Sequence, residues 1–155
     1  GCSPLHFNLA HTGDLAVLGV SRLGPLGVDV ETIRPVKDAD DLVARFFSPR
    51  ESESFQRLTS DRKVNAFFNL WTRKEALLKA SGEGISGGLN RTEVSFLPGE
   101  PARVIAIDEQ AARTPWTLEA FTPAVGFVGA VAIRQDGVQF RSWKFRPLAR
   151  LDVRN

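Results

Sequence analysis

One predicted helix constrains this chain more than any other segment. It includes residues 64–80, and we expect Ser60 or Asp61 to cap it and Gly82 to lie near its end. At about 100° per residue, Phe68 and Trp71 lie within about 40° of Glu75. A helix normally turns such an apolar stripe towards the core, so Glu75 stands where a leucine would be expected. A buried carboxylate without a partner is costly and is usually paired or bound to a metal ion. Two interpretations follow: a salt bridge to Lys79, one turn later, or a metal site.

The composition is that of an ordinary globular chain, with 43% hydrophobic and 25% charged residues over a length of 155 that suits one domain. A net charge of +2 gives no indication of a nucleic-acid partner. The single Cys2 excludes an internal disulfide framework and cysteine-based zinc sites. No apolar run could span a membrane and no signal peptide is visible, so we expect a cytoplasmic setting and no membrane partner. Because the sequence contains no Met, we expect Gly1 to be a processing or cloning boundary of something longer.

Two short apolar segments, 5–9 and 15–20, predict a β-hairpin near the N-terminus, since a turn signal at residues 10–14 separates them. We place His11 in that turn. A histidine there either bonds to the backbone or donates a hydrogen bond to a phosphate oxygen, and the residues alone favour the first interpretation.

The next segment, residues 26–31, predicts a strand that carries two acids on one face. Asp29 and Glu31 are separated by one residue, so their side chains point the same way, about 6–7 Å apart. They repel each other unless a cation lies between them, and oxygen ligands of this kind suit Mg²⁺ or Mn²⁺. The motif alone is weak, because exposed strands often carry acids.

The remaining helices and strands are predicted from hydrophobic periodicity and from capping and turn-forming residues. Helices are predicted at 38–46 and 49–58, the second opened by a capping box of Ser48 and Glu51 around Pro49. Residues 81–88 form a glycine-rich stretch that we interpret as a flexible link. Further strands are predicted at 92–97, 103–107, 116–121, 127–133 and 138–143.

Three motifs occur in a specific order: FNLAHTGD at 7–14, GVDVE at 27–31 and WTRKEALLK at 71–79, with FFSPRE at 46–51 between the last two. Each is weak alone, but the ordered set is highly specific. From about residue 4 to residue 133 the chain resembles the 4′-phosphopantetheinyl transferases of the type that activates surfactin synthetase. The resemblance implies an α+β fold in which an antiparallel sheet packs against one long helix.

The resemblance also implies an activity. The family moves the phosphopantetheine arm of coenzyme A (CoA) onto a serine hydroxyl of an acyl or peptidyl carrier protein and releases 3′,5′-ADP. By motif, Asp29, Glu31 and Glu75 are implied to hold Mg²⁺, or Mn²⁺, together with the pyrophosphate. The seryl hydroxyl needs a base, and Glu75 or Glu31, directly or through a water on the metal, is the candidate. In this light Glu75 is better explained as a ligand than as half of a salt bridge.

Three basic residues are implied to contact CoA. His11 would contact its 3′-phosphate. Lys79 would bind phosphate oxygens and help the leaving group, and Lys74 would assist.

The family is built from two similar α+β halves with CoA between them, and residues 1–25 resemble only the last hairpin of the first half. We therefore interpret 1–155 as one transferase domain that lacks most of that half. The other half belongs to a partner chain, the domain is excised from a larger synthase, or copies assemble into a homo-oligomer. Carrier docking is predicted on residues 33–58, which combine phenylalanines with Arg34, Lys37, Arg45, Arg50 and Arg57.

Two other functions compete. A non-catalytic module that binds CoA or a carrier protein is the main alternative, because half a cleft could bind without turnover. A metal-dependent nuclease also uses acids with a lysine, but the residues His11, Thr12, Gly13 and Trp71 lend it no support.

Overall fold

The computed structural model describes residues 4–82, 89–107 and 115–145. The elements are, in chain order, β1 (His6–Thr12), β2 (Leu15–Ser21), β3 (Leu26–Thr32), α1 (Ala39–Phe46), α2 (Pro49–Gln56), α3 (Ser60–Ser81), β4 (Thr92–Val94), β5 (Val104–Ile107), β6 (Thr117–Phe121) and β7 (Phe127–Ile133). Residues 83–88 of the predicted link lie outside the described residues. Among those that are described, no helix is long and apolar enough to cross a membrane.

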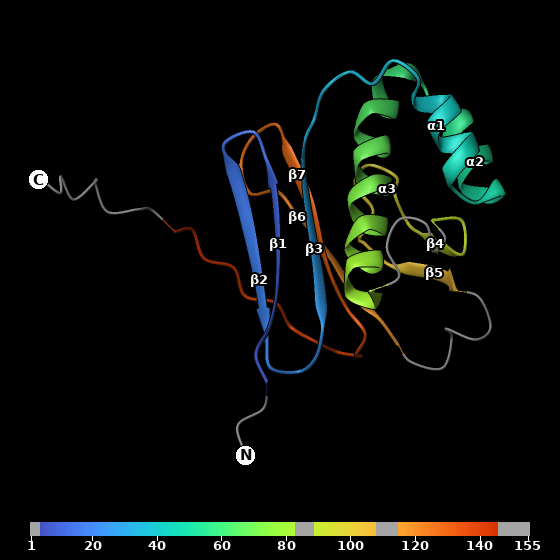
Figure 1. Ribbon diagram of the computed structural model, residues 1–155. Coiled ribbons are helices and arrows are strands. Elements are labelled where there is room, and N and C mark those ends of the chain that lie inside the picture. The colour runs from blue at the N-terminus through green and yellow to red at the C-terminus, as the bar shows by residue number, and fades with distance from the viewer. Residues whose placement is uncertain (1–3, 83–88, 108–114, 146–155) are drawn as a thin grey trace, which may run out of the picture.

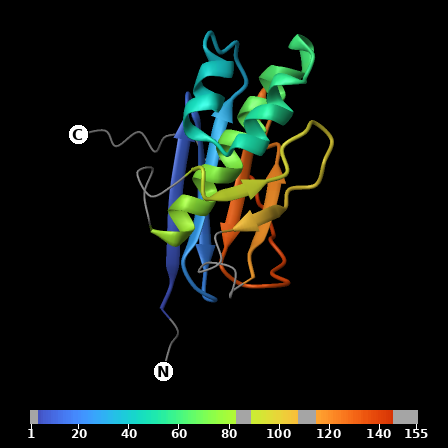
Figure 2. The same ribbon diagram turned by 90° about the vertical axis from the view of Figure 1, so that its right-hand side faces the viewer.

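The central layer is an antiparallel sheet in the order β3-β7-β6, in which Leu26 pairs with Ile133 and Thr32 with Phe127. Figure 1 shows the β1–β2 hairpin on one side of this sheet and α3 on the other, with α1 and α2 beyond α3. In the turned view of Figure 2, α1, α2 and the β4–β5 pair lie in front of α3. The predicted α+β fold, an antiparallel sheet against one long helix, is confirmed.

Helix α3 runs from Ser60 to Ser81, so Ser60, one of the two predicted caps, is its first residue. Gly82 follows the helix, and its φ of 76° is the left-handed conformation typical of a helix C-terminus. The helix lies directly on Gly27 of β3. A Cβ atom at Gly27 would stand 2.0 Å from the backbone oxygen of Ala76 and 2.6 Å from the backbone nitrogen of Ala80. Only a glycine allows the helix to approach the strand this closely.

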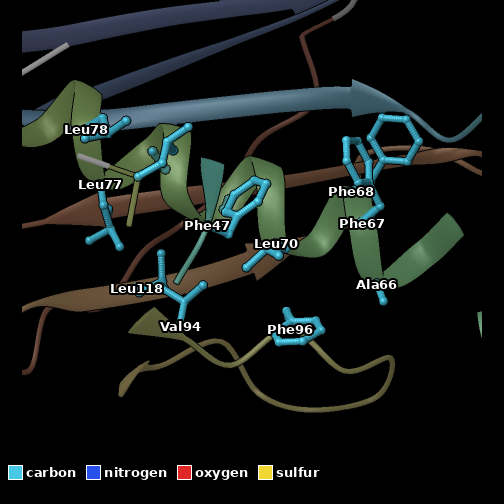
Figure 3. Close-up of a cluster of buried hydrophobic side chains, with 14 of the residues drawn as sticks. Phe47, Ala66, Phe67, Phe68, Leu70, Leu77, Leu78, Val94, Phe96 and Leu118 are labelled. Atoms are coloured by element: carbon cyan, nitrogen blue, oxygen red, sulfur yellow. The ribbon is translucent and has the colours of Figure 1, made fainter. Parts of the chain in front are cut away.

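The main core fills the space between α3, the sheet and the outer elements. Figure 3 shows side chains of α3 that point into it together with residues from the surrounding segments: Phe67, Phe68, Leu70, Leu77, Leu78, Phe47, Val94, Phe96 and Leu118. A second cluster lies between the sheet and the hairpin: Ala10, Leu26, Val28, Val30, Val131 and Ile133. The sheet therefore buries apolar side chains on both faces, as expected of a layer covered on both sides.

The predicted strand at 138–143 does not form. The turn before it is present, with Gly137 at a φ of 65°, but the segment joins none of the sheets among the described residues. Instead the backbone N–H of Val138 donates to the Thr117 hydroxyl at 3.3 Å. Val138 and Phe140 pack on the second cluster, whereas Trp143 is exposed. The apolar residues of this segment thus cover the second cluster, although the segment forms no strand with the described sheets.

Candidate active site

The predicted acidic residues meet where α3 crosses β3. Val28 and Val30 belong to the core cluster on the hairpin side of the sheet. Because side chains alternate along a strand, Asp29 and Glu31 project from the opposite face, the one that α3 covers at Gly27. The close crossing thereby brings acids of β3 next to the C-terminal turns of α3.

Helix α3 contributes Glu75 and Lys79 to this crossing. Glu75 and Asp29 are each only 7% exposed. The Lys79 ammonium donates to Asp29 Oδ1 at 2.8 Å and to the backbone oxygen of Val28 at 3.0 Å. Among the described residues, the ion pair of Lys79 is therefore with Asp29, and a Glu75–Lys79 ion pair is absent. The salt-bridge interpretation of Glu75 is wrong, because the lysine reaches across to the strand.

Two carboxylate oxygens of this group, Oδ2 of Asp29 and Oε1 of Glu75, are buried and have no hydrogen-bond partner among the described residues. Such groups are rare in folded proteins, because each loses its bonds to water and gains none in return. Hard divalent cations prefer carboxylate oxygens as ligands. The two free oxygens therefore fit an added cation between β3 and α3.

The raised pKa values of Asp29 and Glu75 also favour a cation at this position. Burial raises the pKa of Asp29 from 3.8 to about 6, Lys79 opposes the shift, and the charges of Glu31 and Glu75 add to it. Burial also raises the pKa of Glu75, which Lys79 lowers and Glu31 raises. The three carboxyl groups repel one another, and Lys79 offsets only part of their charge. A cation bound here would relieve that repulsion.

Glu31 has a partner that the sequence did not suggest. The Arg34 guanidinium donates to Glu31 Oε2 at 3.3 Å and lies 5.3 Å above the ring of Phe68. In this arrangement, no group of three histidine, cysteine or acidic side chains in the described ranges is placed to hold a metal ion. Asp29 and Glu75 thus have the free oxygens, and Glu31 would have to leave Arg34 to complete the predicted set.

His11 is placed differently from the prediction. It lies within β1, opposite Ala16, and not in the turn. Gly13, with a φ of 54°, allows the hairpin to reverse between Thr12 and Leu15. His11 is exposed on the outer face of the hairpin, the face that carries Phe7.

The structure does not bring Lys74 to this group. Its ammonium is an ion-pair partner of Glu51, donates to the backbone oxygen of Leu89 and lies 5.0 Å above the ring of Phe47. Glu51 also accepts from the backbone N–H groups of Ser48 and Val94, at 3.0 and 2.9 Å. The capping box identified Glu51 as a helix-start residue, but its buried pairing with Lys74 could not be foreseen. Lys74 is a core residue in this fold.

A hollow of about 320 Å³ opens beside Lys79, between the start of β1 and the start of β3. Its lining combines donors and acceptors with apolar side chains: Leu5, His6, Phe7, Asn8, Pro25, Leu26 and Lys79. A ligand that touches Lys79 from this side would also lie against the hairpin.

Comparison with known proteins decides the family. The sequence profile of the 4′-phosphopantetheinyl transferase superfamily matches residues 25–133. The chain belongs to the 4′-phosphopantetheinyl transferase superfamily. The 4′-phosphopantetheinyl transferase HetI of Nostoc is 39% identical over 143 residues, which are 92% of this chain and 57% of that protein. The transferase psf-1 of Bacillus pumilus is 42% identical over 85 residues, 55% of this chain and 35% of its own length.

Solved structures agree on the fold. A holo-(acyl-carrier-protein) synthase from Bacillus anthracis, solved in complex with CoA (3′,5′-ADP), matches with a TM-score of 0.55 and 20% identity over 70% of this chain and 92% of that one. The sequence profile and HetI confirm the resemblance at the level of the superfamily, and the surfactin-type assignment stays a prediction. This transferase-family chain spans little more than half the length of HetI. The predicted domain limits, 1–155, also stay a prediction.

The buried charge of Asp29 predicts a pH-dependent stability. We expect Asp29→Asn to raise the free energy of unfolding by about 1–3 kcal/mol near neutral pH in the absence of divalent cations, because burial raises the pKa of Asp29 from 3.8 to about 6. Because the folded pKa, about 6, lies above the unfolded 3.8, the carboxyl is protonated in both states at low pH and costs nothing there. The cost develops as the pH rises from 3.8 to 6 and is complete above that range.

Urea unfolding of parent and variant with a chelator, at a pH below 3.8 and at neutral pH, measures this difference. The gain should vanish at the lower pH. Equal stability of the two proteins at neutral pH would show that Asp29 is not a strained charge.

Proposed function

We propose that this chain carries the catalytic acids of a transferase that moves the 4′-phosphopantetheine group of CoA to a serine of an acyl or peptidyl carrier protein. The observation that carries the proposal is the pair of unpartnered oxygens on Asp29 and Glu75, next to Lys79, in a chain of this superfamily. Asp29, Glu75 and, once released from Arg34, Glu31 would hold Mg²⁺, with Mn²⁺ as an alternative. When bound, such an ion would supply positive charge that offsets the charge of the transferring phosphoryl group.

The chain's own residues then have separate tasks. The seryl oxygen forms a bond to the β-phosphorus of CoA, the bond from that phosphorus to the bridging oxygen breaks, and 3′,5′-ADP leaves. Glu75 or Glu31 takes the seryl proton. Burial raises the pKa of Glu75 above its usual range, which makes its carboxylate a stronger base than an exposed one. The Lys79 ammonium donates to phosphate oxygens and supports the leaving group. His11 contacts the 3′-phosphate. Lys74, which is committed to Glu51, is left out of the proposed site.

The release of 3′,5′-ADP tests the proposed reaction. The chain is incubated with CoA, Mg²⁺ and an apo carrier protein, and the nucleotide is quantified by liquid chromatography. Release that requires both Mg²⁺ and the carrier serine is the expected result, with a serine-to-alanine carrier as the control. The cytoplasmic setting of this reaction stays a prediction.

A non-catalytic module that binds CoA or a carrier protein is the second candidate. It is favoured by one observation, that the chain covers only 57% of HetI. Calorimetric binding of CoA with no release of 3′,5′-ADP would select it.

We place carrier docking on residues 33–58, now seen as α1, α2 and the segments before and after them. Phe47 and Phe55 are core residues, which leaves the half-exposed Phe46 as the apolar contact. Arg45 lies 5.2 Å above the Phe46 ring, and the Arg50 side chain is 83% exposed. A basic, partly apolar surface of this kind suits an acidic carrier.

Charge reversal tests this surface. Arg45→Glu or Arg50→Glu should raise the KM for the carrier about 3- to 10-fold and leave the KM for CoA nearly unchanged. Arg134→Glu is the matched control, because Arg134 is exposed and follows Ile133, which pairs with the start of β3, far along the sheet from α1. If neither variant changes the KM for the carrier, the carrier docks on another surface.

We also propose that the chain does not act as a free monomer. The outer face of the hairpin exposes a set of apolar side chains: Leu5, Phe7, Leu9, Leu18 and Val20. Such a surface drives association, either with further copies of this chain or with the half that the family's fold includes. Sedimentation velocity at micromolar concentration should give a mass above that of one chain. A monomer with full transferase activity would contradict this proposal.

A further inference from the structure

Strands β1 and β3 lie side by side although they belong to different sheets (Figure 1). Two side-chain contacts join them, and each links residues 20 positions apart: Asn8 with Val28, and Thr12 with Thr32. The equal spacing means that the two strands run in the same direction in one register. Because no backbone ladder joins β1 to β3, these side chains set that register.

The contact of Asn8 requires a side-chain acceptor at one position, because its partner is a backbone N–H group. The backbone N–H of Val28 donates to Asn8 Oδ1 at 2.9 Å. The carbonyl of the same residue accepts from the Lys79 ammonium at 3.0 Å. Backbone groups of neighbouring residues in an antiparallel strand point to alternate sides, so both groups of Val28 face the edge away from β7. One residue of β3 is thus held by the hairpin on its N–H and by the proposed phosphate-binding lysine on its C=O.

The register of β1 decides where His11 stands. His11 projects from the outer face of β1, and Asn8 from the inner face. A slip of one residue along β3 would move His11 by about 3.3 Å and turn it to the other face. Asn8 and Lys79 also line the same hollow, so a ligand there touches both elements that this contact joins.

We propose that Asn8 is a positioning residue, which fixes His11 relative to Lys79 and Asp29 so that one CoA molecule meets both the 3′-phosphate contact and the carboxylate group. The inference rests on the proposed function. It assigns Asn8 no contact with the reacting atoms: its task is the register between the hairpin and β3.

The test compares CoA with 3′-dephospho-CoA, which lacks only the phosphate assigned to His11. The quantity is the ratio of kcat/KM for the two substrates in the parent, Asn8→Ala, His11→Ala and the double variant. We expect each single variant to lower the ratio about tenfold, mainly through the KM for CoA. The double variant should lower it no further, because both changes remove the same contact. Asn8→Asp keeps an acceptor oxygen for the Val28 N–H and should retain the parental ratio.

The outcomes separate the inference from the proposed function. If Asn8→Ala lowers kcat/KM for both substrates equally, Asn8 has only a structural role and the inference is wrong. Additive losses in the double variant would also overturn it. If His11→Ala leaves the ratio unchanged, the assignment of His11 fails and the inference fails with it. Absence of transfer in every variant, the parent included, would contradict the proposed function itself.

Discussion

Replacement of Asp29 or Glu75 by alanine is expected to lower phosphopantetheine transfer by at least about 1,000-fold while the fold stays intact. Each residue carries a buried oxygen that has no hydrogen-bond partner in the part of the chain that the structure describes, and the two come from β3 and α3 at their crossing. Removing either one leaves two of the three proposed ligands, and one of these, Glu31, is paired with Arg34. We expect this remainder to bind a divalent cation too weakly for catalysis. The measurement is single-turnover transfer with saturating CoA and Mg²⁺.

The thermal midpoint of each variant distinguishes loss of chemistry from loss of fold. Glu75→Ala removes a buried charge, so its midpoint should equal or exceed that of the parent. Glu119→Ala, at an exposed position on β6, is the matched control and should transfer at the parental rate. Parental rates in the Asp29 and Glu75 variants would rule out the metal assignment.

Gly27→Ala should have the second largest effect. The added Cβ would overlap the backbone of α3 at Ala76 and Ala80, and backbone atoms cannot rotate aside as a side chain can. Either the helix moves off the strand or the strand distorts. We expect a loss of at least about 3 kcal/mol of stability, measured by urea unfolding. Transfer should fall about 100-fold or more even where the variant is folded, because Glu75 and Lys79 move away from Asp29.

Gly137→Ala is the comparison for this variant. Gly137 has a φ of 65°, and no described atom beyond its chain neighbours lies within 4 Å of where a Cβ would stand, so an alanine there meets strain without a clash. The expected cost is about 1 kcal/mol, with no change in transfer. If Gly27→Ala were as mild as Gly137→Ala, the close crossing of α3 and β3 would not be what assembles the site.

The sequence predicts this site well where the signal is local. Helical periodicity placed Glu75 on a buried face, and strand alternation placed Asp29 and Glu31 together on one face of β3. These patterns depend only on the geometry of one element. The hairpin, the capping box of α2 and the glycine at the end of α3 follow from equally local rules.

Partners from other elements could not be predicted in this way. The pairing of Lys79 with Asp29 joins residues 50 positions apart, whereas the salt bridge to Glu75 was the local choice. The family resemblance implied that Lys74 is a site residue, but Glu51 of α2, 23 positions away, holds it in the core. The segment 138–143 had the alternation of a strand, and alternation does not reveal whether a strand edge is free to pair.

Intact mass spectrometry of the carrier protein tests the central claim most directly. An apo carrier is incubated with CoA and this chain, with Mg²⁺ or with a chelator, beside a parallel reaction that contains the Asp29→Ala variant. We predict that the carrier gains the mass of one phosphopantetheine group only with the parent chain and Mg²⁺. An unchanged carrier mass at saturating CoA would contradict the account, as would equal loading by the Asp29→Ala variant.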